Sequence, residues 1–68
     1  MITADSITDD QIRELRRAIV NDATASSAET DAACNLCAIA LDDGKLPFRI
    51  IRDARAQCAE IFNARSAK

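Results

Sequence analysis

The sequence predicts a small all-α protein folded as a three-helix bundle. Three observations predict it. Gly44 and Pro47 are the only glycine and proline in 68 residues, β-branched side chains form no runs, and apolar residues recur at helical spacing. A chain of this length forms one domain, here residues 1–68, and we expect residues 1–6 to be a disordered tail before the first helix.

The first helix is predicted over residues 9–21. Thr8 has the side chain of an N-cap, and Gln11 stands three residues later, which is the spacing of a capping box. Beyond this start, Ile12, Leu15 and Ile19 follow at helical spacing and define one apolar face. We expect this face to pack onto the other two helices.

The second helix is predicted over residues 27–43 and is expected to be the central one. Ser26 and Glu29 repeat the capping-box spacing at its start, and Gly44 offers a left-handed position after its end. Apolar side chains cover most of the circumference of this segment, so it should be buried on more than one side.

The third helix is predicted over residues 47–65, with Pro47 in the first turn, where its missing N–H costs nothing. The turn from Asp43 to Leu46 is short, so the second and third helices should form an antiparallel hairpin. As an alternative, this hairpin dimerises into a four-helix bundle with the first helix across it. Monomer and homodimer therefore both stay open.

The net charge of the chain is small, and its charged residues are unevenly distributed along the sequence. The net charge is −2, with three Arg against nine acidic residues in residues 1–44 and six basic against two acidic residues in 45–68. This balance argues against non-specific binding to nucleic acid or to a membrane surface. No apolar run approaches the ~20 residues of a membrane span, and the start lacks the basic and apolar regions of a signal peptide. We expect a cytoplasmic protein.

Cys34, Cys37 and Cys58 are the candidate metal-binding or redox residues. Zinc usually takes four Cys or His ligands, and this chain has no His and no fourth Cys. Cys34 and Cys58 should lie roughly opposite each other in the hairpin. The favoured interpretation is that these are small core residues and that the protein has no cofactor. A structural metal or redox module stays open as an alternative.

Protein–protein binding is the favoured function, through the acidic N-terminal half or the apolar part of the second helix. Arg55 falls between Phe48 and Phe62 on the apolar edge of the third helix, so it either pairs with an acid within the fold or contacts a partner. Arg49 and Arg52 are expected to face outward. The candidate partner-binding residues are Asp31, Ile39, Asp42, Asp43, Arg49, Arg52 and Arg55.

A small DNA-associated regulator is a further alternative, since basic residues gather on two helices. They are Arg13, Arg16 and Arg17 around Val20, and Lys45, Arg49 and Arg52. An antiparallel hairpin is the wrong geometry for a helix-turn-helix, and the Asn and Gln expected at base edges are sparse, so nucleic acid is not the expected partner. No nucleophile with a base, phosphate loop or carboxylate pair is present, and we expect no enzymatic activity.

Several short motifs cover most of the chain. They are Ile7-Thr8-Asp9-Asp10-Gln11-Ile12 with Leu15-Arg16, Cys37 followed by Ala40-Leu41, and Ala54-Arg55-Ala56-Gln57-Cys58-Ala59 with Ile61 and Ala64-Arg65. In these motifs the chain resembles small helical proteins encoded by bacteriophages, prophages and plasmids. It departs from them in residues 21–30, where a Ser/Thr/Ala loop replaces a Gly-containing turn. The resemblance implies a mobile-element accessory protein that binds and inhibits a host machine, such as a CRISPR complex, a polymerase or a nuclease.

Overall fold

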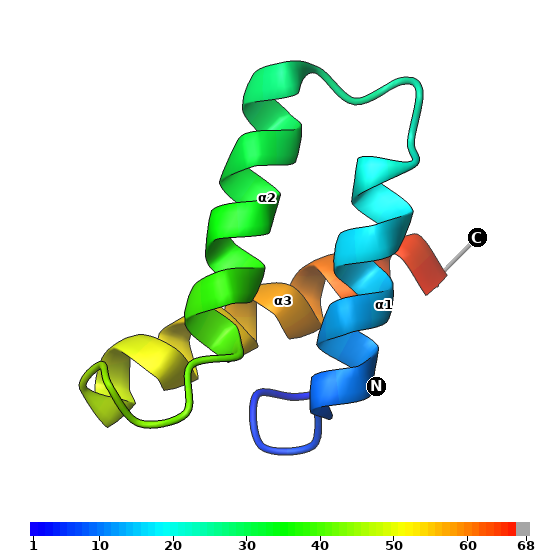
Figure 1. The fold of residues 1–68 in the computed structure, drawn as a ribbon. Helices are drawn as coiled ribbons and strands as arrows, with labels where there is room; N and C mark the ends of the chain where they lie inside the picture. Colours follow the sequence, from blue (N-terminus) through cyan, green and yellow to red (C-terminus); the bar gives the residue numbers. More distant parts are fainter. Residues whose placement is uncertain (67–68) are drawn as a thin grey trace.

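The computed structural model describes residues 1–66, and within them the chain forms three helices and no strand. Helix α1 spans Asp9–Val20, α2 spans Ser27–Ala40 and α3 spans Phe48–Ser66. Figure 1 shows α1 and α2 side by side in opposite directions, with α3 running across them. The all-α three-helix prediction is confirmed, and each helix start lies within one residue of its predicted position.

The start of α1 is a capping box, as predicted. The Oγ1 atom of Thr8 accepts the N–H of Gln11 at 3.1 Å, and the N–H of Thr8 donates to Oε1 of Gln11 at 2.8 Å. Two N–H groups that the helix cannot satisfy internally thereby gain partners. The following turns place Ile12, Leu15 and Ile19 in the core.

Helix α2 is the central helix, as predicted, because it packs against both α1 and α3, which contact each other less. Its contact with α3 is close. The core consists of Ile7, Ile12, Leu15, Ile19, Cys37, Ala40, Ala54, Cys58 and Ala59. The large core side chains precede or belong to α1, whereas α2 and α3 contribute only Ala and Cys to this buried set, which lets their backbones approach.

The end of α2 differs from the prediction, since the helix stops at Ala40 and not at residue 43. A carboxylate oxygen of Asp42 accepts the N–H groups of Gly44 at 2.9 Å, Lys45 at 2.6 Å and Leu46 at 3.2 Å. These bonds replace helical ones and close a turn. Gly44 adopts a φ of 110°, which favours glycine, within this turn and not directly after the helix.

The direction of α3 also differs from the antiparallel one expected, although its close packing on α2 is confirmed. Figure 1 shows α3 crossing α2, while α1 and α2 form the antiparallel pair. Residues 41–47 make the connection longer than the short turn that was expected, so α3 is free to turn away from the axis of α2. The side chain of Arg55 then fixes the crossing by binding the last carbonyl of α2.

Residues 1–6 do not behave as the tail that we expected. The N–H of Ile2 donates to Oδ1 of Asn63 at 3.0 Å, and Nδ2 of Asn63 donates to the carbonyl of Ile2 at 2.7 Å. The N–H groups of Ser6 and Ile7 donate to the carbonyl of Thr3 and form a turn. The amide of Asn63 thus matches both polar groups of one backbone residue and ties this segment to α3.

Candidate functional site

Arg55 lies where three segments of the chain meet. Its Nη1 donates to the carbonyl of Ala40 at 2.9 Å and to Oδ1 of Asp9 at 3.0 Å, and its Nη2 donates to the carbonyl of Ile7 at 2.7 Å. The side chain is only 23% exposed. Arg55 was expected either to pair within the fold or to contact a partner, and in the structure it pairs within the fold. Few of its N–H groups remain free to bind a partner.

Arg49 and Arg52 are both exposed, as expected for outward-facing residues of α3. Nη2 of Arg52 lies 3.4 Å from Oδ2 of Asp5, with both side chains largely in solvent, so this ion pair contributes little to stability. Within residues 1–66, Arg49 makes no ion pair. Arg49 is the more available of the two for a partner.

The acidic candidates are not equivalent. Asp31 and Asp43 are exposed, whereas Asp42 is half-buried and occupied by its turn. Partial burial of the Asp42 carboxyl raises its pKa, but the backbone hydrogen bonds that it accepts outweigh this effect and hold the pKa below its usual 3.8. Ile39 is half-buried against the core. The surface expected around Ile39 is therefore partly used by the fold itself.

The cysteines gather at the crossing of α2 and α3. Cys37 and Cys58 are fully buried and lie close enough for each to affect the pKa of the other, while Cys34 is half-buried. Cys34 was expected roughly opposite Cys58, and the cysteine that lies beside Cys58 in the structure is Cys37, one helical turn further along α2. Within residues 1–66, all three thiols are free, and no group of three potential metal ligands is found. The two buried thiols act as core side chains.

Alkaline pH is expected to destabilise the protein through Cys58. Burial, reinforced by the nearby Cys37 thiol, raises the pKa of Cys58 from 9.0 to about 12. Above pH 9 the unfolded chain therefore loses a proton that the folded chain retains, and the free energy of unfolding falls until about pH 12. Urea unfolding at pH 8 to 11 measures this slope, which should be shallower for Cys58→Ala by an amount that corresponds to about one proton per molecule. Equal slopes would contradict it.

The exposed start of α3 is the main apolar feature of the surface. We call it the α3 tip and define it as Lys45, Leu46, Phe48, Arg49 and Ile50. The exposed fractions of its apolar members are 37% for Leu46, 77% for Phe48 and 43% for Ile50. Figure 1 shows the first turns of α3 projecting beyond the lower end of α2. Apolar and basic side chains thus share one protruding end.

The exposure of Phe48 was not anticipated, because helical spacing placed it on the apolar stripe of α3 together with Phe62. In the structure Phe62 is half-buried against the core, and Phe48 is not. The start of α3 extends past α2, so no helix covers it. The signal available in the sequence was Pro47, which places Phe48 in the first turn, at the extreme end of the stripe.

A second exposed feature lies on the outer side of α1. We call it the α1 arginine face and define it as Arg13, Arg16, Arg17 and Val20, which line a shallow hollow of about 360 Å³. The three Arg are exposed, and the side chain of Val20 is 53% exposed. The basic patch expected on this helix is therefore present, and an aliphatic side chain lines the same hollow.

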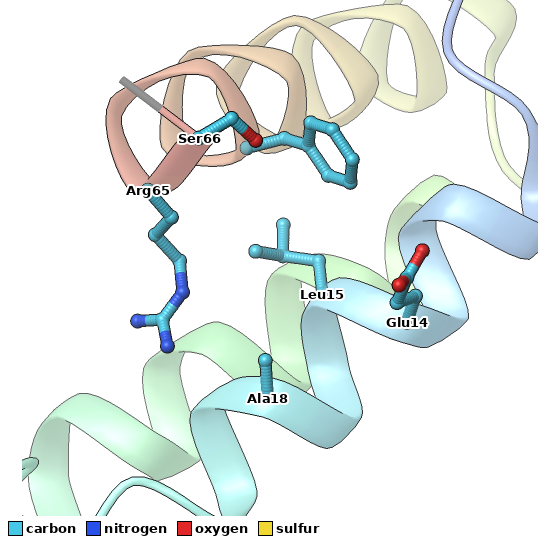
Figure 2. A pocket seen from close by; sticks show the side chains of 6 residues that line it. Glu14, Leu15, Ala18, Arg65 and Ser66 are labelled. Atoms are coloured by element: carbon cyan, nitrogen blue, oxygen red, sulfur yellow. The ribbon is translucent and has the colours of Figure 1, made fainter. Parts of the chain in front are cut away.

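A smaller hollow separates α1 from the end of α3. Figure 2 shows Glu14, Leu15 and Ala18 of α1 facing Arg65 and Ser66 of α3 across it. Its volume of about 160 Å³ is below the ~300 Å³ of typical small-molecule sites. Its ionisable side chains lie at the edges of the opening in Figure 2, and nothing in this arrangement points to a reaction.

The crossing of α3 over α1 and α2 removes the geometric argument against a helix-turn-helix, which rested on an antiparallel hairpin. The charges of α3 provide another argument. The exposed charged residues of α3 are mixed, with Asp53 and Glu60 among Arg49, Arg52 and Arg65. The two carboxylates would repel the phosphates of DNA, so α3 lacks the uniformly basic side of a typical DNA-reading helix.

These observations define a small all-α domain whose exposed features are an apolar helix end and a basic helix face. Comparison of the chain with protein-family models, with curated proteins and with solved structures found no match. Among residues 1–66, none of the helices combines the length and apolar character needed to cross a membrane. The exposed surfaces are therefore the basis for assigning a function.

Proposed function

We propose that this chain is a non-enzymatic protein–protein interaction module, a mobile-element accessory protein of the cytoplasm that binds and modulates a host protein. The α3 tip is the proposed contact surface. The observation that carries the proposal is the 77% exposure of Phe48. Aromatic side chains are enriched among the residues that dominate protein–protein binding energy.

The exposure of Phe48 is costly for so small a chain. Burying a Phe side chain contributes roughly 2 kcal/mol, and a domain of this length has a total stability of roughly 3–10 kcal/mol. The chain has only two Phe, and its core contains many Ala and Cys. Leu46 and Ile50 add exposed apolar surface at the same end of α3. A partner that covers this end would bury these apolar side chains and gain the free energy that folding alone does not.

The charges of the α3 tip indicate the chemistry of the partner. Lys45 and Arg49 are exposed, and within residues 1–66 neither makes an ion pair. An apolar centre with basic side chains beside it complements an apolar pocket on the partner with acidic residues at its rim. The apolar anchor supplies affinity, while the rim charges increase the association rate and the specificity.

The test compares capture of proteins from nuclease-treated bacterial lysate by the tagged wild type, by Phe48→Asp and by the control Ala28→Asp. Both substitutions add one negative charge at the first turn of a helix, where the dipole tolerates it, and both positions are exposed. We expect a salt-resistant protein partner that Ala28→Asp retains and Phe48→Asp loses. With the purified partner, Phe48→Asp should raise Kd at least about tenfold, which is about 1.4 kcal/mol.

Two outcomes would contradict the proposal. If the two variants capture the same proteins as the wild type, the α3 tip is not the binding surface. If the wild type is a dimer by light scattering and Phe48→Asp alone is a monomer, a second copy of the chain covers the tip. That result would favour the homodimer over the host partner.

A further inference from the structure

The α1 arginine face is a second exposed surface, on a different helix from the α3 tip. Its residues are three and four positions apart, so Arg13, Arg16, Arg17 and Val20 lie on one side of α1. This side flanks the apolar face of Ile12, Leu15 and Ile19 that packs into the core. Figure 1 places the second half of α1 away from the start of α3, so the two surfaces are separate.

The positive charge of this face exceeds what the fold uses. Nη1 of Arg13 lies 3.1 Å from Oδ1 of Asp10, and this pair is exposed. Within residues 1–66, Arg16 and Arg17 make no ion pair. The dipole of α1 favours a basic residue in its last turn, which accounts for Arg17. Neither capping nor ion pairing accounts for Arg16.

Val20 makes this face more than a solvated basic patch. Its aliphatic side chain is 53% exposed within the hollow that the three Arg line. Guanidinium groups bind carboxylates through paired hydrogen bonds, and their aliphatic stems extend an apolar surface. The combination therefore complements a segment that carries several carboxylates around one apolar side chain.

We infer that the α1 arginine face binds an acidic segment of a partner protein. Carboxylates of that segment pair with Arg13, Arg16 and Arg17, and an apolar side chain of the same segment covers Val20. The inference goes beyond the function proposed above, because it concerns a separate surface and either one can fail alone.

Phosphates of nucleic acid also pair with Arg, but the observations favour protein carboxylates. The chain has a net charge of −2, so a long polyanion is not attracted to it as a whole. Val20, which lines the same hollow as the three Arg, has nothing to offer a phosphate, whereas an apolar side chain can bury it. A duplex is therefore a comparison probe in the test.

The test measures binding of a short fluorescein-labelled peptide, with Glu residues around a central Leu, to the full chain by fluorescence anisotropy at physiological salt. We expect Arg16→Glu combined with Arg17→Glu to raise Kd at least about tenfold. The matched control is Lys45→Glu combined with Arg49→Glu, which changes the net charge equally at the α3 tip. The control should change Kd by no more than about twofold. Circular dichroism checks that both variants remain folded.

A second readout isolates the apolar contact. The wild type should prefer the Leu peptide to the same peptide with Ser in its place, and Val20→Ala should lose that preference. The inference is overturned if the peptide does not bind, if Val20→Ala keeps the preference, or if both charge-reversal variants weaken binding equally. It is also overturned if a DNA duplex binds more tightly than the peptide and depends on Arg16 and Arg17, which would assign the face to nucleic acid.

Discussion

Arg55→Ala is expected to lower the free energy of unfolding by about 3 kcal/mol, since hydrogen bonds to a charged group contribute roughly 1.5–3 kcal/mol each and do not add fully. The substitution removes the shared partner of the Ala40 and Ile7 carbonyls, both in part-buried surroundings. The contact with the exposed carboxylate of Asp9 adds little. The hydrogen bonds that are lost join α3 to the end of α2 and to the start of α1.

Urea unfolding followed by circular dichroism measures this effect. Arg55→Lys should be intermediate, because an ammonium keeps the charge but lacks the planar fork that reaches two carbonyls. The control is Arg49→Ala, at an exposed position on the same helix, which should change stability by less than about 0.5 kcal/mol. If Arg55→Ala costs no more than this control, the junction does not hold the crossing of α3.

Ile12→Ala is expected to remove about half of the free energy of unfolding. Ile12 is 0% exposed and, within residues 1–66, is one of four large aliphatic side chains in the buried core. Truncating such a residue costs roughly 2–5 kcal/mol, against a total stability of roughly 3–10 kcal/mol for this chain length. The Ala and Cys around the α2–α3 crossing are too small to fill the cavity.

Thermal unfolding followed by circular dichroism gives the measurement for Ile12. Ile12→Val, which removes one methylene, should cost about 1 kcal/mol, and Val20→Ala at an exposed site should cost less than about 0.5 kcal/mol. A midpoint for Ile12→Ala equal to that of Val20→Ala would show that Ile12 is not a central core residue.

The starts of the helices were predictable because their signals are local. Thr8 with Gln11 and Ser26 with Glu29 located the starts of α1 and α2, and hydrogen bonds from the capped N–H groups confirm both. The end of α2 was not predictable in this way. It depends on Asp42, whose carboxylate competes with the helix for three N–H groups. The crossing of α3 depends on contacts between segments far apart in the sequence.

The candidate surfaces were predictable only in part. Spacing along a helix correctly placed Arg49 and Arg52 on the outside of α3. The same spacing placed Phe48 on the apolar stripe, because periodicity assigns a side chain to a face and does not say how far the covering helix extends. Ile2 shows the same limit. Its backbone is hydrogen-bonded by Asn63, and no pattern within residues 1–6 predicts a partner so distant in the sequence.

The small side chains at the crossing of α2 and α3 also restrict how this fold can vary in evolution. A larger residue at Ala40, Ala54 or Ala59, all buried, would overfill the core and push the helices apart. We therefore expect natural variants that keep the crossing to have small residues, such as Ala, Gly, Ser or Cys, at these three positions. We expect the sequence differences between such variants to lie mainly on the exposed faces, where binding partners can differ. The buried contact between α2 and α3 should change little.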